Sequence, residues 1–382
     1  MATSLSLYIH IPWCVKKCPY CDFNSHALSA GGDGGLDPDL AETYVNQLIT
    51  DLHADLEDFG LSPSIHSIFI GGGTPSLLPV RSLDRLFKAI NAVVPIEADA
   101  EITLEANPNS ADQSRLRGYR EAGVNRLSLG VQSFDDHSLL HLGRLHGSAE
   151  AKRAIDAARA AGFSNINIDL MFGLPHQTLP MAVADLNQAL DFYPEHLSWY
   201  QLTIEPNTVF FNRRPHQTNH DALADISNAG RALLEQAGFD RYEVSAFAKQ
   251  GRECRHNLHY WQFDDYLGIG AGAHGKLSDY EFIQRTQKTR APGDYLTTPN
   301  RQTRKVSGHD LVTEYLLNAL RLRRGFTLEH FEEKTRQSAS QLLPALERCE
   351  QLTLVSLRDE HVLLTEFGYD HLDSLLARLT EN

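Results

Sequence analysis

Eight residues, Cys14-Val15-Lys16-Lys17-Cys18-Pro19-Tyr20-Cys21, decide the fold of this chain. They follow an apolar run from Leu5 to Pro12, which predicts a buried strand that delivers the three thiols to a loop at its carboxyl end. A [4Fe-4S] cluster that only carries electrons takes four thiolates, and structural zinc also takes four ligands. Three thiolates leave one metal position open, and an open position is what metal-based chemistry requires.

The spacing C-x3-C-x2-C resembles that of the radical S-adenosylmethionine superfamily. The resemblance implies that Cys14, Cys18 and Cys21 hold a [4Fe-4S] cluster whose fourth iron is chelated by S-adenosylmethionine. Two alternatives stay open on the motif alone. A Cys3His zinc site that includes His10 or His26 would make a zinc-stapled interaction protein, and the three thiols could also be buried without a metal.

A glycine run follows the second predicted strand, Ile65 to Ile70, in the segment Gly71-Gly72-Gly73-Thr74-Pro75. Glycines at the end of a strand let the backbone approach a ligand and leave its amide groups accessible, although such a run is as often a tight turn. The segment resembles the GGGTP motif of the same superfamily, which implies that Gly72, Gly73 and Thr74 receive the amino group of the methionine moiety. Tyr8, in the first strand, is either a core residue or a residue facing the cofactor.

The pattern of strand, polar strand end and helix then repeats along the chain. Four further strands are predicted at residues 100–108, 125–133, 164–173 and 196–206, with helices between them. Six such units predict a parallel α/β sheet, either a partial (β/α)6 barrel related to the TIM barrel or a doubly wound open sheet. The superfamily resemblance favours the partial barrel of radical S-adenosylmethionine type.

Polar residues gather at the carboxyl ends of these strands, where an α/β barrel has its functional rim. Glu105, Gln132 and Asp169 occupy such positions, and their side chains can hold ribose hydroxyls. Resemblance to the anaerobic coproporphyrinogen III dehydrogenase branch, from Tyr8 to about Gly275, implies that these three residues and Arg144 contact S-adenosylmethionine. Without that resemblance, Arg144 could equally be a solvated helix charge.

Beyond the barrel, the segment His256-Asn257-Leu258-His259-Tyr260-Trp261 places histidines beside aromatic rings. Such a cluster is more often ordinary packing than a haem site, although imidazole ligates haem iron. The segment resembles the HNxxYW motif of the HemW-type haem chaperones, which implies that His256 ligates haem. His259 is an alternative ligand in the same segment, and Cys254, two residues before it, could ligate haem or equally be an inert thiol.

Two features separate this chain from the dehydrogenases it resembles. Those enzymes carry a further cysteine where Phe23 stands here, and they have a long N-terminal arm, whereas thirteen residues precede Cys14. Oxidative decarboxylation of coproporphyrinogen III is therefore not expected and is kept only as an alternative function. The expected function is transfer of haem to an acceptor protein whose identity the sequence does not give.

The last part of the chain no longer follows the pattern of alternating strands and helices. Two helices, a hairpin turning at residues 358–361 and a final helix predict a small winged-helix-like domain, and the expected divisions are residues 1–215, 216–300 and 301–382. Acidic residues outnumber basic ones there, so packing over the barrel or docking a partner is favoured over DNA binding. The short basic stretch from Arg321 to Arg324 is predicted to be a solvated face.

Composition limits the remaining functions. The formal net charge of −14 argues against nucleic acid as the main partner. No uninterrupted apolar run is long enough to span a bilayer, and five cysteines, three of them clustered, indicate a reducing cytoplasm. The acceptor of haem is expected in the cytoplasm or at the inner face of the membrane, which the protein would meet peripherally, and a homodimer that depends on the cluster is a hypothesis.

Overall fold

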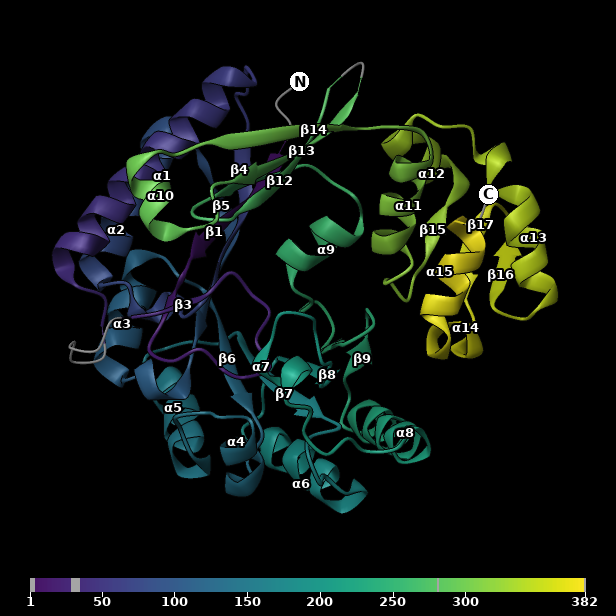
Figure 1. Cartoon of the computed structure of the whole chain (residues 1–382), viewed down its shortest axis with the longest axis horizontal. Helices are drawn as coiled ribbons and strands as arrows, with labels where there is room; N and C mark the ends of the chain where they lie inside the picture. The colour runs from purple at the N-terminus through teal and green to yellow at the C-terminus, as the bar shows by residue number, and fades with distance from the viewer. Residues whose placement is uncertain (1–3, 29–34, 280–281, 381–382) are drawn as a thin grey trace.

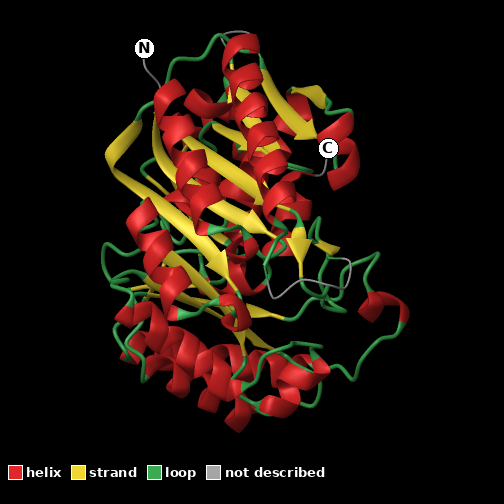
Figure 2. Cartoon of the chain, turned by 90° about the vertical axis from the view of Figure 1, so that its left-hand side faces the viewer, coloured by secondary structure: helices red, strands yellow, loops and turns green. Residues whose placement is uncertain are grey.

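A curved sheet of parallel strands forms the centre of the computed structural model, which describes residues 4–28, 35–279 and 282–380 (Figures 1 and 2). All six predicted strands are present and lie side by side in chain order. They are β1 (Ser4–Ile11), β4 (Ser64–Gly72), β5 (Ile96–Ala106), β6 (Arg126–Gln132), β7 (Ile166–Phe172) and β8 (His196–Gln201). Because every pair among them is parallel, their carboxyl ends share one edge.

Helices cover the outer face of this sheet, as parallel strands require. One or two helices lie between consecutive parallel strands and return the chain to the start of the next strand, and further helices follow β8 (Figure 1). They are α1 (Pro38–Asp58), α2 (Val80–Val93), α3 (Gln113–Ala122), α4 (Asp136–His141), α5 (Ser148–Ala160), α6 (Leu179–Leu190) and α8 (His220–Gln236), and the short helix α7 (Val209–Asn212) follows β8. The apolar faces of the strands and helices meet in one buried core.

The sheet is curved and is not closed into a ring (Figure 1), which agrees with the prediction of a partial α/β barrel. β11 (Tyr266–Ile269) pairs in parallel with the free side of β1. Three antiparallel strands continue outward from β11: β12 (His274–Ser278), β13 (Ile283–Lys288) and β14 (Arg301–Val306). The helices α9 (Arg255–Trp261) and α10 (Pro292–Thr297) flank these strands. An extension of the barrel was expected within residues 216–300, but its strands were not predicted.

The opposite edge of the sheet differs from what the local sequence predicts. The run Tyr242-Glu243-Val244-Ser245-Ala246-Phe247-Ala248 predicts a single strand, but the structure has two short strands, β9 (Asp240–Arg241) and β10 (Ala246–Ala248). The Glu243 carboxylate accepts hydrogen bonds from the backbone N–H and the hydroxyl of Ser245, at 2.9 and 3.0 Å. These bonds turn the chain between the two strands.

The C-terminal part has its own apolar core and lies beside α9 (Figure 1). Its hairpin and final helix agree with the expected winged-helix-like arrangement, but one strand (β15) and one helix (α12) precede the hairpin in addition to the two expected helices. The elements up to the hairpin are α11 (Gly308–Ala319), β15 (Phe326–Thr327), α12 (Leu328–Thr335), α13 (Leu343–Gln351), β16 (Val355–Arg358) and β17 (His361–Leu364). Two helices, α14 (Glu366–Asp370) and α15 (Leu372–Thr380), complete it. Within the described ranges, no helix has the length and apolar content needed to cross a membrane.

The prediction that the basic stretch at residues 321–324 is a solvated face is wrong for two of its arginines. Arg321 pairs with the buried carboxylate of Glu243 at 3.0 Å and lies over the ring of Trp261. Arg323 pairs with Glu366 and lies over the ring of Tyr369. Arg321 therefore joins the C-terminal part to the barrel.

Candidate cofactor site

The cysteine loop lies at the carboxyl edge of the sheet because β1 ends directly before it. The short strands β2 (Trp13–Cys14) and β3 (His26–Ala27) pair in parallel and close the loop at its base. Within the loop, the N–H of Cys21 donates to the carbonyl of Cys18 at 3.1 Å. The three thiols line one cavity of about 290 Å³.

The same cavity collects most of the predicted site residues. β1 and β4 are parallel, with Ile11 opposite Gly72, so the glycine run lies beside the start of the cysteine loop. A Cβ atom on Gly73 would lie 2.5 Å from the carbonyl oxygen of Trp13, so this close contact requires glycine. The predicted residues that line the cavity are Cys14, Cys18, Cys21, Gly72, Gly73, Thr74, Glu105, Gln132, Arg144 and Asp169.

The arrangement of the thiols fits an iron–sulfur cube better than a zinc ion. In the part of the chain that the structure describes, no three side chains of His, Cys, Asp or Glu come close enough to share one metal ion. Tetrahedral zinc needs such convergence, whereas each liganded iron of a cube takes one thiolate. Three thiols spread around a cavity with an open side therefore suit the cube.

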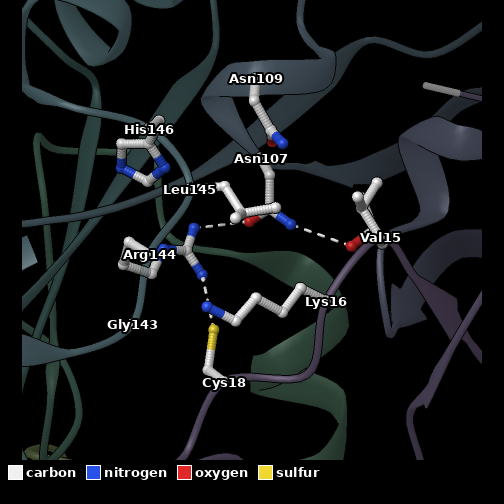
Figure 3. A pocket seen from close by; sticks show the side chains of 10 residues that line it. Val15, Lys16, Cys18, Asn107, Asn109, Gly143, Arg144, Leu145 and His146 are labelled. Carbon is white, nitrogen blue, oxygen red and sulfur yellow. Dashed lines mark hydrogen bonds between the residues drawn. The ribbon is translucent and has the colours of Figure 1, made fainter. Parts of the chain in front are cut away.

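Arg144 lines the cavity and is half-buried, so the alternative of a solvated helix charge is wrong. Figure 3 shows its side chain in a neighbouring pocket, which shares Cys18, Asn107 and Arg144 with this cavity. One guanidinium nitrogen, Nη2, donates to Asn107 Oδ1 and to the carbonyl of Gly130, both at 2.6 Å. The other, Nη1, lies 3.7 Å from the sulfur of Cys18. The Nε atom has no partner among the described residues, which leaves one buried donor for a carboxylate or another acceptor in the cavity.

Gln132 has an unusual backbone conformation at the same rim. Its φ is 71°, and the pairing of β6 with β7 shifts by one residue between Gly130 and Gln132. A bulge of this kind turns a side chain toward a site at the cost of local strain. The side-chain oxygen accepts a hydrogen bond from the Tyr200 hydroxyl at 2.8 Å, and both residues line the cavity.

Asp169 lies deeper in the barrel and is held by two side chains. Asn167 Nδ2 donates to Oδ1 at 2.7 Å, and the Ser128 hydroxyl donates to Oδ2 at 3.2 Å. Burial raises the pKa of Asp169, and these hydrogen bonds oppose that shift. Sequence reasoning did not single out Ser128, Ser198 and Tyr200, which also line the cavity, although alternation along β6 and β8 places them on one face.

Glu105 stands at the boundary between this cavity and a larger one. Its Oε2 accepts a hydrogen bond from the N–H of Gly72 at 3.2 Å. Its enclosed position and the nearby carboxylate of Asp169 raise the pKa of Glu105 to about 8. Near neutral pH the side chain is therefore mostly protonated and can donate a hydrogen bond as well as accept one.

We expect the contribution of Glu105 to the stability of the cofactor-free protein to fall as the pH rises from 4.5 to 8. The folded protein keeps a proton on Glu105 that the unfolded chain releases above its ordinary pKa of 4.5. This contribution should therefore decrease by up to about 1.4 kcal/mol per pH unit. Urea unfolding of the original protein and of Glu105→Gln at several pH values measures it, because the difference between their free energies of unfolding should fall across this range. A difference between the two proteins that does not change with pH would contradict the shifted pKa.

The second cavity, of about 520 Å³, adjoins the first and shares the residues Phe23, Gly72 and Glu105 with it. Tyr8 lines this cavity, so it faces a ligand space and does not belong to the core. Its hydroxyl is hydrogen-bonded to His10 Nδ1 at 2.9 Å. Phe23, which is 61% exposed, stands at the opening between the two spaces.

His256 lies outside both cavities. It is 1% exposed, its Nδ1 is hydrogen-bonded to the Ser67 hydroxyl at 2.9 Å and its Nε2 to the Tyr260 hydroxyl at 2.8 Å. Burial lowers the pKa of His256, which keeps the imidazole neutral. Because Tyr260 lines the larger cavity, its hydroxyl separates His256 from that space. His259 is half-buried, with Nε2 bonded to the carbonyl of Asp265 at 2.6 Å.

Two family models match the sequence. The model of the radical SAM superfamily covers residues 8–189, and that of the HemN C-terminal domain covers residues 306–371. The chain is 46% identical to the heme chaperone HemW of Haemophilus influenzae and to that of Escherichia coli, in each case over 97% of both chains. It is 36% identical to the heme chaperone HemW of Bacillus subtilis over 95% of this chain and 96% of that one.

A comparison with solved structures shows the same fold. Coproporphyrinogen III oxidase (HemN) from Escherichia coli, a radical SAM enzyme, superposes with a TM-score of 0.82 over 99% of this chain and 90% of that one. The two sequences are 22% identical, so this match concerns the fold alone.

Proposed function

The chain belongs to the HemW family of radical S-adenosylmethionine proteins, and from this premise we propose that it binds haem, one [4Fe-4S] cluster and S-adenosylmethionine and transfers haem to an acceptor protein. The observation that carries the proposal is the pair of adjoining cavities. One is lined by three cysteines and by polar strand ends, and the other is larger and has aromatic walls. Phe23, Gly72 and Glu105 form the boundary between them.

We assign the cluster to Cys14, Cys18 and Cys21. When bound, it would supply one-electron chemistry and an open iron position for the methionine moiety of S-adenosylmethionine. Around that position, Gly72, Gly73 and Thr74 would meet the amino group, and the unpaired Nε of Arg144 would meet an acceptor such as the carboxylate. The remaining contacts to the nucleoside would come from Glu105, Gln132 and Asp169.

We assign haem to the larger cavity, with His256 as an iron ligand under one condition. Iron needs a lone pair on the imidazole, and both nitrogens of His256 are hydrogen-bonded. Tyr260 would have to turn its hydroxyl away from Nε2 before His256 could reach the iron. Tyr8 would face the bound porphyrin from the strand beside the cluster loop.

The proposal places the protein in the cytoplasm, with an acceptor there or at the inner face of the membrane. Nucleic acid is not a proposed partner, given the net charge of −14. Membrane contact and a homodimer are further hypotheses, which vesicle sedimentation and light scattering before and after iron chelation can test.

Titration of haem into anaerobically reconstituted protein tests the function. We expect one saturable haem site per chain in the original protein. We expect His256→Ala to bind haem more weakly, by about tenfold or more, with unchanged iron and sulfide content. His53→Ala is a matched control, because His53 is exposed on α1.

Two results would contradict the proposed function. One is the absence of saturable haem binding in the reconstituted protein. The other is formation of protoporphyrinogen from coproporphyrinogen III under reducing, anaerobic conditions, which would show that the protein is a porphyrinogen dehydrogenase.

A further inference from the structure

The larger cavity has two chemically different kinds of lining residue. Tyr8 and Tyr266, on the paired strands β1 and β11, and Tyr260 line it with aromatic rings, and the polar side chains of His274, Gln287 and Arg290, on or directly after β12 and β13, complete the lining. Its volume of about 520 Å³ falls within the roughly 300–1,000 Å³ typical of ligand pockets. A flat apolar ring system with carboxylates at its edge matches this division, because rings pack against rings and a guanidinium pairs with carboxylate.

Three imidazoles lie in or beside this cavity, and only one of them has nitrogen atoms available to a ligand. His10 lines it, but its Nδ1 is bonded to the Tyr8 hydroxyl and its Nε2 to the carbonyl of Asn24 at 2.9 Å. His256 lies behind Tyr260 and has both nitrogens bonded. The ring of His274 is exposed at the cavity wall and makes no hydrogen bond or ion pair within residues 4–28, 35–279 and 282–380.

The backbone around His274 holds its position. His274 is directly opposite Gln287 in the antiparallel pair of β12 and β13, so both side chains lie on the same face of the sheet. The N–H of Lys288 donates to the carbonyl of Ala273 at 2.9 Å and fixes the end of this ladder. Partial burial, together with Arg285 and Arg290, lowers the pKa of His274, so that its imidazole is neutral near pH 7.

Arg290 follows β13 at the same end of the cavity. Its carbonyl accepts a hydrogen bond from Asn24 Nδ2 at 2.9 Å, and the same Asn24 nitrogen donates to the carbonyl of Ala271 at 2.9 Å. Asn24 therefore attaches the cysteine loop to the sheet extension. The guanidinium of Arg290 is exposed and forms no ion pair with any residue that the structure describes.

We propose that His274 is an axial ligand of haem iron in this cavity and that Arg290 pairs with a propionate of the same haem. This assignment depends on the proposed function of haem binding. His274 can coordinate iron with the cavity as it stands, whereas His256 can do so only after Tyr260 has moved. An incoming haem would therefore meet His274 first.

The experiment compares haem with iron-free protoporphyrin IX as ligands of the anaerobically reconstituted protein. For His274→Ala we expect an affinity for haem lower by about tenfold or more and a displaced Soret band, with unchanged affinity for protoporphyrin IX. Added imidazole should restore the original Soret band. Arg290→Gln should weaken the binding of both porphyrins by about tenfold and leave the Soret band in place.

The other possible results would overturn either this inference or the proposed function. If His274→Ala weakens haem and protoporphyrin IX equally, or if haem affinity and spectrum stay unchanged, His274 is not an iron ligand and the inference is overturned. Loss of haem binding in His256→Ala combined with unchanged binding in His274→Ala would overturn the inference and leave the proposed function standing. Absence of saturable haem binding in the original protein would instead refute the proposed function.

Discussion

A Cys18→Ser protein that is reconstituted anaerobically with iron and sulfide should contain almost no acid-labile sulfide and should not bind S-adenosylmethionine. With three thiolates available, removal of one leaves two ligands for a cube that needs three. A serine hydroxyl stays protonated near pH 7 and is a hard donor, whereas thiolates are the ligands that iron–sulfur clusters select. Iron and sulfide analysis, together with equilibrium binding of the nucleotide, measures both effects.

Cys349→Ala is the matched control for this experiment. Cys349 is buried in α13 of the C-terminal part, within a separate apolar core. The variant should keep the iron, the sulfide and the nucleotide binding of the original protein. Retention of a complete cluster by Cys18→Ser, or a single zinc ion in the original protein, would contradict the assignment of the three cysteines.

The barrel and the rim of its cofactor cavity could be predicted from sequence because their signals are local. Each of the six parallel strands contains a short apolar run, and several of them end in glycine or in a polar residue, as β4 does at Gly72, β6 at Gln132 and β8 at Gln201. The register between neighbouring strands then places their carboxyl ends side by side, as with Ile11 opposite Gly72. The chemical type of Glu105, Gln132 and Asp169 at strand ends therefore predicted that they line one cavity.

The sheet extension could not be predicted because its pairing is long-range. β11 pairs with β1 across most of the chain, in the register Tyr8 opposite Gly268, and no local pattern specifies that partner. β14 is mostly exposed, and its polar sequence does not predict a strand. The larger cavity, with His274 and Arg290 in its wall, exists only after these strands have paired.

No local sequence pattern predicts the charged group inside the barrel. Arg126 begins β6 and reads as a surface residue before an apolar run, yet it is 2% exposed. Its charge lies among Glu101, Asp169 and the buried thiol of Cys254, which interact with it electrostatically and favour its charged form. The start of β6 therefore holds a buried charged group as well as apolar side chains.

We expect Arg126→Met to lower the free energy of unfolding by about 1–3 kcal/mol at pH 7, because it removes the positive charge that interacts with the carboxylates of Glu101 and Asp169. Arg126 lowers the pKa of Asp169 against the larger effect of burial, so its removal should raise that pKa further. A protonated Asp169 needs no counter-charge. The destabilisation should therefore be smaller at pH 5 than at pH 7.

Urea unfolding of the original protein and the variant at both pH values measures these differences. Arg120→Met serves as the control, since Arg120 is exposed near the end of α3 and its loss should change stability by at most about 0.5 kcal/mol. A loss in Arg126→Met as small as in the control would show that methionine packing replaces the buried charge. A large loss of stability that is equal at both pH values would contradict a role for the charge of Arg126 next to Asp169. Arg126 would then stabilise the fold through its volume and its hydrogen bond to the Thr103 hydroxyl.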